Sequence, residues 1–263
     1  QATRAEGLSF LKAGIATRNP GFNALIERIE RVATATRSPI LLTGPTGAGK
    51  TRMARRIFEL KQTRHQISGR FVELNCATLR GDAVMSALFG HTRGAFTGAA
   101  PHLGFFRAAQ GGTLLLDEIG DLSPQAQPKL LRVLEDRLVY PVGSVVGYPV
   151  DVRLLFATNR DLDAASQAGT FRGDLYARLA ELTVKLPPLR ARREDILLLL
   201  SHALAGRQVA LSASLAEAML PLCALMGLPQ AAARPGSAAG IRPCARYQAS
   251  VPASPSSRLT CGR

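Results

Sequence analysis

Two kinds of hydrophobic pattern alternate along this chain. Residues 21–36 carry apolar side chains at helical spacing, with glutamate and arginine on the opposite face. Residues 38–44 form a short apolar run bounded by proline and glycine, which predicts a buried strand. Further strands are predicted at 69–79, 111–122 and 149–162, and further helices at 51–65, 127–138 and 171–182. Strands that alternate with helices favour an α/β fold, in which helices cover both faces of a parallel sheet.

The alternation stops after about residue 200. One more helix is predicted around 214–220, and from residue 230 onward 20 of 34 residues are Ala, Pro, Gly or Ser without any periodicity. Such a composition buries too little apolar area to offset the entropy cost of ordering the chain. We therefore expect the tail at 229–263 to be disordered or aberrant, as a frameshifted or misjoined end would be.

Net charge raises the question of a nucleic-acid partner. The 263 residues carry a formal charge of +14, and 46% of them are hydrophobic, which is enough for a sizeable core. Five of the positive charges are arginines after Glu217, where Asp and Glu are absent, and the rest of the chain holds no dense basic run. Nonspecific basicity, a nucleic-acid face and phosphate ligands are all compatible with this charge.

Cysteines and histidines do not form a metal-binding pattern. The four cysteines have no paired spacing, and His65 and His91 lack a carboxylate or cysteine at ligand spacing. Cys76, at a strand end, is expected to be packed and inert. The apolar run 196–200 is too short to span a bilayer, and the N-terminus has neither an initiator Met nor a signal peptide. The sequence therefore predicts a cytoplasmic fragment of a longer protein, without a membrane span.

A glycine-rich loop follows the first predicted strand and opens a helix. It matches G-x-x-x-x-G-K-[ST] and comprises Gly44, Pro45, Thr46, Gly47, Ala48, Gly49, Lys50 and Thr51. The backbone N–H groups of such a loop curl around phosphate oxygens, and the helix N-terminus adds positive potential. We expect Lys50 to reach the β and γ phosphates of ATP, and the Thr51 hydroxyl to bind Mg²⁺.

Two acidic residues end another predicted strand. Asp117 and Glu118 follow the run Thr-Leu-Leu-Leu. We expect Asp117 to hold Mg²⁺ through water and Glu118 to polarise the attacking water. The alternative is a strand that merely ends in solvent with Asp-Glu. The order of loop and acids in an alternating α/β chain favours ATP hydrolysis.

These motifs, together with HTRGAFTGA at 91–99, resemble the AAA+ domain of bacterial sigma-54-dependent transcription activators. The resemblance extends over residues 11–196, and the stretches GRFVELNCATL and ATRNPGFNALIERIERVA are similar to RNA-repair operon regulators of the RtcR type. It implies a P-loop AAA+ ATPase subdomain at 21–188 after a linker at 1–20, and a partial helical lid at 189–228. It also implies ATP and Mg²⁺ as cofactors and a ring, typically a hexamer, as the working state.

The resemblance gives a role to a lone aromatic residue in a flexible stretch. In the family, the GAFTGA motif tips a loop that grips the sigma-54 factor, and ATP raises and lowers this loop to remodel the closed promoter complex of RNA polymerase. The matching residues here are Gly94, Ala95, Phe96, Thr97, Gly98 and Ala99. Exposing one aromatic side chain forgoes about 1.5–3 kcal/mol of burial, which a partner contact would offset. The alternative is that Phe96 folds back into the core.

Four further residues match functional positions of the family. Asn75 matches the polar residue that holds the catalytic glutamate aside, so it would switch Glu118; an ordinary strand-end Asn is the alternative. Asn159 matches the sensor I position, which reads the γ phosphate or the water. Arg172 and Arg178 match arginines offered to the ATP of the neighbouring subunit, although one of the pair could be an ordinary surface residue. A guanidinium suits this role because it is planar, always charged and bidentate toward phosphate.

The sequence departs from the family in three places. Thr51 stands where many members have Glu, with no expected loss, and Pro128 falls within a predicted helix, whose first turn it would end or shift. The third departure is in the lid, where the GN-x-RE/D-L segment with the sensor II arginine is missing. We also expect the helix-turn-helix domain that would contact DNA, and an N-terminal sensory domain, to be absent from this sequence. We therefore expect ATP binding, with turnover and DNA binding impaired or lost.

Three functions are compatible with these observations. The first is an ATP-driven remodeller of sigma-54 RNA polymerase. It is favoured by an intact set of residues that comprises Lys50, Asp117, Glu118, Arg172 and Arg178. The second is a nucleotide-binding remnant without turnover, favoured by the missing lid segment. The third is a nucleic-acid-binding module, supported by charge alone. Salt-dependent DNA binding without a response to ATP would favour the third.

Overall fold

The computed structural model describes residues 10–15, 17–78, 82–92, 102–196 and 198–200. The chain divides into two compact units, 1–203 and 204–263, and the described residues all belong to the first. The expected loop at 94–99, most of the expected lid and the expected disordered tail lie outside the described residues.

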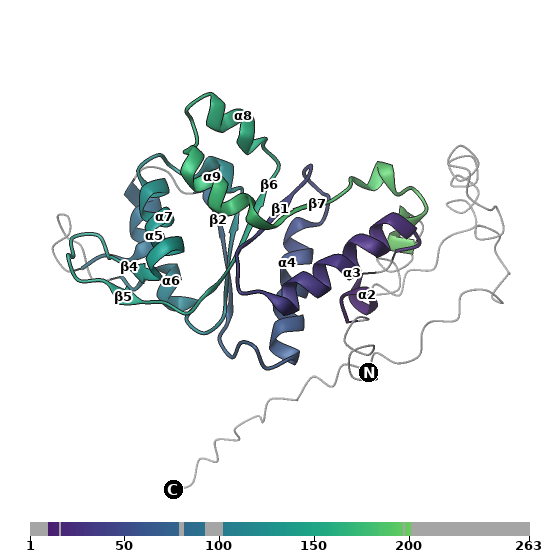
Figure 1. Ribbon diagram of the computed structural model, residues 1–263, viewed down its shortest axis with the longest axis horizontal. Helices are drawn as coiled ribbons and strands as arrows, with labels where there is room; N and C mark the ends of the chain where they lie inside the picture. Colours follow the sequence, from purple (N-terminus) through teal and green to yellow (C-terminus); the bar gives the residue numbers. More distant parts are fainter. Residues whose placement is uncertain (1–9, 16, 79–81, 93–101, 197, 201–263) are drawn as a thin grey trace, which may run out of the picture. The chain divides into compact units, whose positions relative to one another are not determined.

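A parallel sheet forms the centre of the first unit (Figure 1). Its five strands follow the order β2-β3-β6-β1-β7. They are β1 (Ile40–Thr43), β2 (Phe71–Asn75), β3 (Thr113–Asp117), β6 (Arg153–Thr158) and β7 (Thr183–Lys185). The pairs β1–β6, β1–β7, β2–β3 and β3–β6 are all parallel, which confirms the expected α/β class. Two short strands, β4 (Leu138–Val139) and β5 (Tyr148–Pro149), form a separate antiparallel pair.

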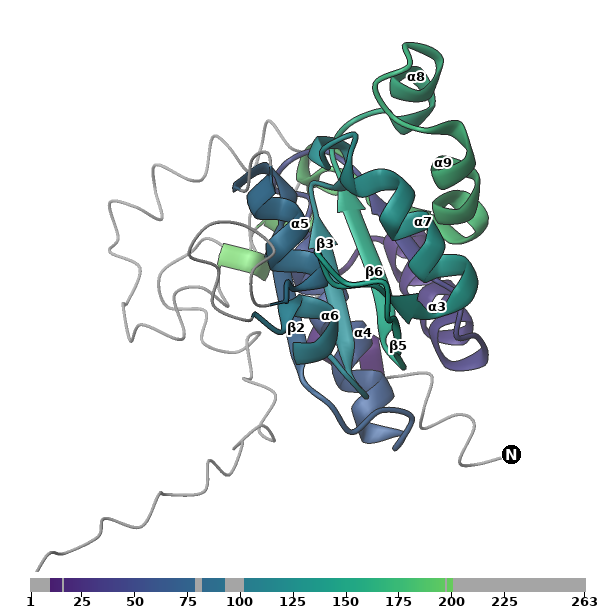
Figure 2. The same cartoon turned by 90° about the vertical axis from the view of Figure 1, so that its left-hand side faces the viewer.

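Helices cover both faces of this sheet. One face carries α2 (Phe10–Gly14), α3 (Pro20–Ala35) and α4 (Lys50–Thr63). The other face carries α5 (Asp82–Phe89), α6 (Gly104–Ala108), α7 (Ala126–Asp136), α8 (Leu162–Gln167) and α9 (Gly173–Leu179). Figure 2 shows α5, α6 and α7 in front of the strands. Four short 3-10 turns complete the described chain: η1 (Cys76–Thr78), η2 (Ile119–Asp121), η3 (Ala180–Leu182) and η4 (Leu189–Ala191).

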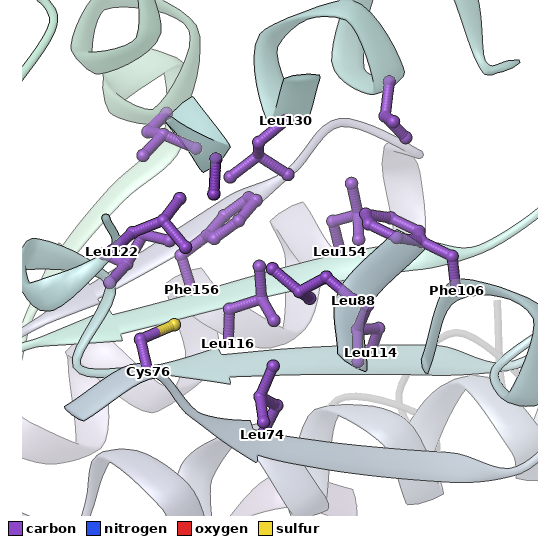
Figure 3. Close-up of a cluster of buried hydrophobic side chains, with 14 of the residues drawn as sticks. Leu74, Cys76, Leu88, Phe106, Leu114, Leu116, Leu122, Leu130, Leu154 and Phe156 are labelled. Carbon is purple, nitrogen blue, oxygen red and sulfur yellow. The ribbon is translucent and has the colours of Figure 1, made fainter. Parts of the chain in front are cut away.

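The two faces hold two separate hydrophobic cores, and alternate residues of one strand enter different cores. In β3, Leu114 and Leu116 belong to the core under α5, α6 and α7, whereas Leu115 belongs to the core under α3 and α4. Figure 3 shows Leu116 of β3 and Leu88 of α5 pointing toward each other in the first of these cores. Burial on both sides explains why β1, β3 and β6 carry uninterrupted apolar runs rather than alternating ones.

The helices α3, α4, α7 and α9 agree with the sequence pattern, with two adjustments at their ends, whereas α2, α5, α6 and α8 were not predicted. α7 begins at Ala126, so Pro128 lies in its first turn, where a backbone N–H has no intrahelical partner to lose. The helix predicted at 171–182 is shorter, because α9 ends at Leu179 and the chain tightens into η3. Among the described residues, none of the helices has the length and apolar character to cross a membrane.

Candidate active site

The glycine-rich loop connects β1 to α4, as the sequence predicts, and its glycines are required by backbone geometry. Gly47 and Gly49 have positive φ angles of 81° and 95°, in the left-handed region that disfavours other residues. Gly44 has a φ of 148°, and a Cβ there would lie 2.6 Å from the carbonyl oxygen of Leu186. The loop can therefore take this path only with glycine at these positions.

Lys50 is the first residue of α4, and its side chain folds back over the loop. Its Nζ donates to the carbonyl oxygen of Gly44 at 3.0 Å and to that of Pro45 at 3.4 Å. The same Nζ lies 4.0 Å from Oε1 of Glu118, and the side chain is only 7% exposed. A buried ammonium group with carbonyl partners and one nearby carboxylate is poised for a polyanionic ligand.

The two acids lie at the carboxyl end of β3, facing the start of α4. The Thr51 hydroxyl donates to Oδ2 of Asp117 at 3.2 Å, and the Glu118 N–H donates to Oδ1 of the same carboxylate at 3.0 Å. Hydroxyl and carboxylate oxygens are the ligands that Mg²⁺ prefers, so this pair fits the predicted metal. Glu118 itself has a φ of 49°, which costs a non-glycine residue about 1–3 kcal/mol.

Asn159 joins the acids to the glycine-rich loop. It follows β6, which lies between β1 and β3 in the sheet. Its backbone N–H donates to Oε2 of Glu118 at 3.1 Å, and its Nδ2 donates to Oγ1 of Thr46 at 3.0 Å. One residue thus contacts both halves of the site.

Asn75 lies beside the acids, but its side chain is used locally. It pairs in register with Asp117 across β2 and β3. Its Oδ1 accepts from the Ala77 N–H at 2.9 Å, which caps the turn η1. In this structure the Glu118 carboxylate is contacted by Lys50 and Asn159 rather than by Asn75. The expected switch between Asn75 and Glu118 would require Asn75 to leave this cap.

The two predicted arginines are held by their own carboxylates. Arg172 pairs with Asp174 at 2.6 Å, and Arg178 pairs with Glu181 at 3.1 Å. Both guanidinium groups are about half exposed, and both pairs lie within or beside α9. Arg178 also lines a surface cavity of about 220 Å³ with Arg37 and Arg137. The arginines are therefore accessible, and their partners are carboxylates rather than the glycine-rich loop of the same chain.

Cys76 is fully buried behind the acids, which confirms that it is packed. Burial, together with the negative charges of Asp117, Asp121 and Glu118, raises the pKa of its thiol to about 12. A thiol with such a pKa stays protonated at neutral pH and is a poor nucleophile.

Arg192 and Asp195, which lie just after η4, were not predicted from the sequence. Both are buried, and Arg192 donates to the carbonyl oxygen of Ala48 in the glycine-rich loop. Arg192 also lines a cavity of about 160 Å³ that includes Phe22 and Gly47. The available signal was an Arg and an Asp three residues apart, which is too common a pattern to indicate a site.

Comparisons with known proteins agree with this geometry. Residues 15–185 match the model of the sigma-54 interaction domain. The chain is 57% identical over 194 residues to the transcriptional regulatory protein RtcR of Escherichia coli K12, covering 73% of this chain and 36% of RtcR. It is 49% identical over 170 residues to the Nif-specific regulatory protein of Herbaspirillum seropedicae, covering 64% of this chain and 31% of that protein. The chain thus spans about a third of the length of these curated relatives.

A solved structure shows the same fold. NtrX from Brucella abortus in complex with ATP is 38% identical, with a TM-score of 0.62 over 74% of this chain and 43% of NtrX. The sequence match and the fold match together confirm the resemblance to sigma-54-dependent activators. The chain belongs to the family of proteins that carry a sigma-54 interaction domain of the AAA+ type.

Proposed function

We propose that this chain is the ATP-hydrolysing part of a transcription activator that remodels sigma-54 RNA polymerase. The observation that carries the proposal is the convergence of Lys50, Thr51, Asp117, Glu118 and Asn159 in one bonded cluster. Lys50 and Thr51 begin α4, which the glycine-rich loop joins to β1, and the other residues lie at the ends of β3 and β6. Ligands of open α/β sheets bind at the carboxyl ends of the strands. The ATP complex of the relative NtrX supports the same ligand.

Each residue of the cluster has a distinct task in this proposal. Lys50 exchanges its carbonyl partners for phosphate oxygens of ATP, because an anion is the stronger partner. Thr51 and Asp117 would hold Mg²⁺, whose charge offsets that of the phosphates. Glu118 orients and polarises the water that attacks the γ phosphorus, and Asn159 holds the Glu118 carboxylate in place. Asn75 would take over that carboxylate in another nucleotide state.

The partners follow from the family and from the two exposed arginines. The stretch Gly94–Ala99, with Phe96 at its centre, would contact the sigma-54 factor, although it lies outside the described residues. Arg172 and Arg178 would serve the ATP of a neighbouring subunit in a ring, which their exposed positions on α9 support. We place this activity in the cytoplasm, where the polymerase acts.

Steady-state ATP hydrolysis, measured against protein concentration, tests this function. We expect specific activity to rise with concentration, because each subunit would need arginines from its neighbour. Lys50→Ala should lower the rate by about a hundredfold or more, as expected for the loss of a charged group at the transferred phosphate. Lys12→Ala is the matched control, since Lys12 forms an exposed ion pair with Glu27.

The opposite outcome is equally informative. A rate no higher than that of Lys50→Ala, in folded protein that still binds ATP, would contradict the proposal. It would favour the nucleotide-binding remnant without turnover.

A further inference from the structure

A buried ion pair joins three parts of the chain that are distant in sequence. Asp195 is fully buried, and its Oδ2 lies 3.6 Å from Nη1 of Arg192. The same carboxylate accepts from the Thr17 hydroxyl at 2.6 Å and from the Arg18 N–H at 2.6 Å. The chain before α3 is therefore fastened to the segment that follows β7.

Arg192 carries the connection onward to the glycine-rich loop. Its Nη2 donates to the carbonyl oxygen of Ala48 at 3.3 Å, and its guanidinium carbon lies 4.1 Å from the centre of the Phe22 ring. The Phe22 ring, which belongs to α3, packs against the Arg192 guanidinium, and Asp195 supplies the opposite charge. A buried guanidinium with these partners has little freedom to move unless Asp195 moves with it.

The Ala48 carbonyl is a sensitive point of the loop. In a trans peptide the C=O and the next N–H point in opposite directions, so a carbonyl held by Arg192 turns the Gly49 N–H away from it. Gly49 has a positive φ and no Cβ to resist rotation of this peptide. The direction of a phosphate-facing N–H thus depends on the hydrogen bond from Arg192.

We propose that Arg192 and Asp195 are positioning residues for ATP, and that they make the shape of the glycine-rich loop depend on how residues 17–18 are held. This inference rests on the proposed function, because it takes ATP as the ligand of the loop. Releasing Thr17 from Asp195 loosens Arg192 and, through it, the Ala48–Gly49 peptide. ATP affinity then falls, whereas the bond from the Asn159 N–H to the Glu118 carboxylate, which involves neither Arg192 nor Ala48, keeps its arrangement.

The test uses the full chain and a variant that touches neither the loop nor the acids. Thr17→Val removes one hydroxyl from Asp195 and is expected to raise the Kd for ATP·Mg by about two- to thirtyfold, the range that mutations in coupled networks span. The Kd is measured by calorimetry, and kcat is expected to change much less than KM. Thr17→Ser keeps the hydroxyl and should restore the wild-type Kd. Thr63→Val, which removes an exposed hydroxyl from α4, is the matched control.

A double-mutant cycle identifies the route of the coupling. In an Arg192→Lys background, which loses the planar contact with Phe22 and weakens the bond to Ala48, Thr17→Val should raise the Kd less than it does in wild type. Thermal melting shows which variants are folded, and only folded variants enter the cycle.

Two results overturn the inference. One is a Kd for Thr17→Val equal to that of Thr63→Val, and the other is full additivity in the cycle. If wild type and Lys50→Ala are alike in failing to bind ATP, the proposed function fails, and this inference fails with it. If wild type binds ATP and Thr17→Val binds it equally well, only this inference fails.

Discussion

Lys61 is a buried cation at the end of α4 remote from the glycine-rich loop. The side chain is 4% exposed, and its Nζ donates to the carbonyl oxygen of Thr36 at 3.1 Å. Burial, followed by the charges of Arg153 and Arg37, lowers the pKa of Lys61 to about 8. The folded protein therefore gives up this proton more readily than the unfolded chain does.

We predict that this residue makes stability depend on pH in the alkaline range. Between the folded pKa of about 8 and the ordinary value of 10.5, the unfolded chain binds more protons, so the free energy of unfolding rises with pH. The contribution of one group has a slope of at most about 1.4 kcal/mol per pH unit. Urea unfolding from pH 7 to 10.5 should show a shallower rise for Lys61→Met than for wild type. Equal slopes for the two proteins, or an effect of the same size from exposed Lys12→Met, would contradict this assignment.

The residues of the site differ in how well their roles can be predicted from the sequence. Lys50 and Thr51 could be predicted because a phosphate loop is built from consecutive residues whose spacing is dictated by the backbone. Arg192 could not, because its partner Ala48 lies 144 residues away, and neither residue type is distinctive alone. The hydrogen bond that Asn75 Oδ1 accepts from the Ala77 N–H of its own turn could not be predicted either, since local capping competes with longer-range contacts.

At the level of elements, burial on both faces decides what the sequence reveals. β3 has a continuous apolar run because its side chains enter both hydrophobic cores. It lies within the strand predicted at 111–122. β7 has only three residues, Thr-Val-Lys, and is partly exposed at the sheet edge, so no apolar run indicates it. The pair β4–β5 has two residues in each strand and depends on tertiary contacts rather than on periodicity.

The interior strand β3 should contribute much of the stability. Leu115 of β3 is fully buried between helices and neighbouring strands, so Leu115→Ala leaves a cavity and should lower the free energy of unfolding by about 2–5 kcal/mol. Urea denaturation measures the change. Leu103→Ala removes the same atoms from a side chain that is 66% exposed and should change the free energy of unfolding by less than about 0.5 kcal/mol. Similar decreases in the free energy of unfolding for the two variants would contradict the prediction that burial of Leu115 contributes this stability.

For the whole molecule, we predict that arginines of one subunit act at the ATP site of a neighbouring subunit. In the proposed function, Lys50→Ala disables the ATP site but keeps the arginines, whereas Arg178→Ala keeps the ATP site and removes one arginine. If arginines act across a subunit boundary, a mixture of the two inactive variants should hydrolyse ATP faster than the sum of the separate proteins. The control mixture replaces Lys50→Ala by the double variant that also carries Arg178→Ala. Activity that stays at the sum of the parts in both mixtures would rule out sharing of Arg178.

The strand order also has a consequence for synthesis of the protein. The loop at 44–49 emerges early, but Thr46 bonds to Asn159, which is 113 residues further along the chain. Gly44 packs against the backbone of Leu186, which follows β7. Because β6 lies between β1 and β3, the two halves of the site meet only after β6 has inserted between them. As the proposed ligand, ATP would therefore stabilise the finished domain, but it could not serve as a template for an early intermediate on the ribosome.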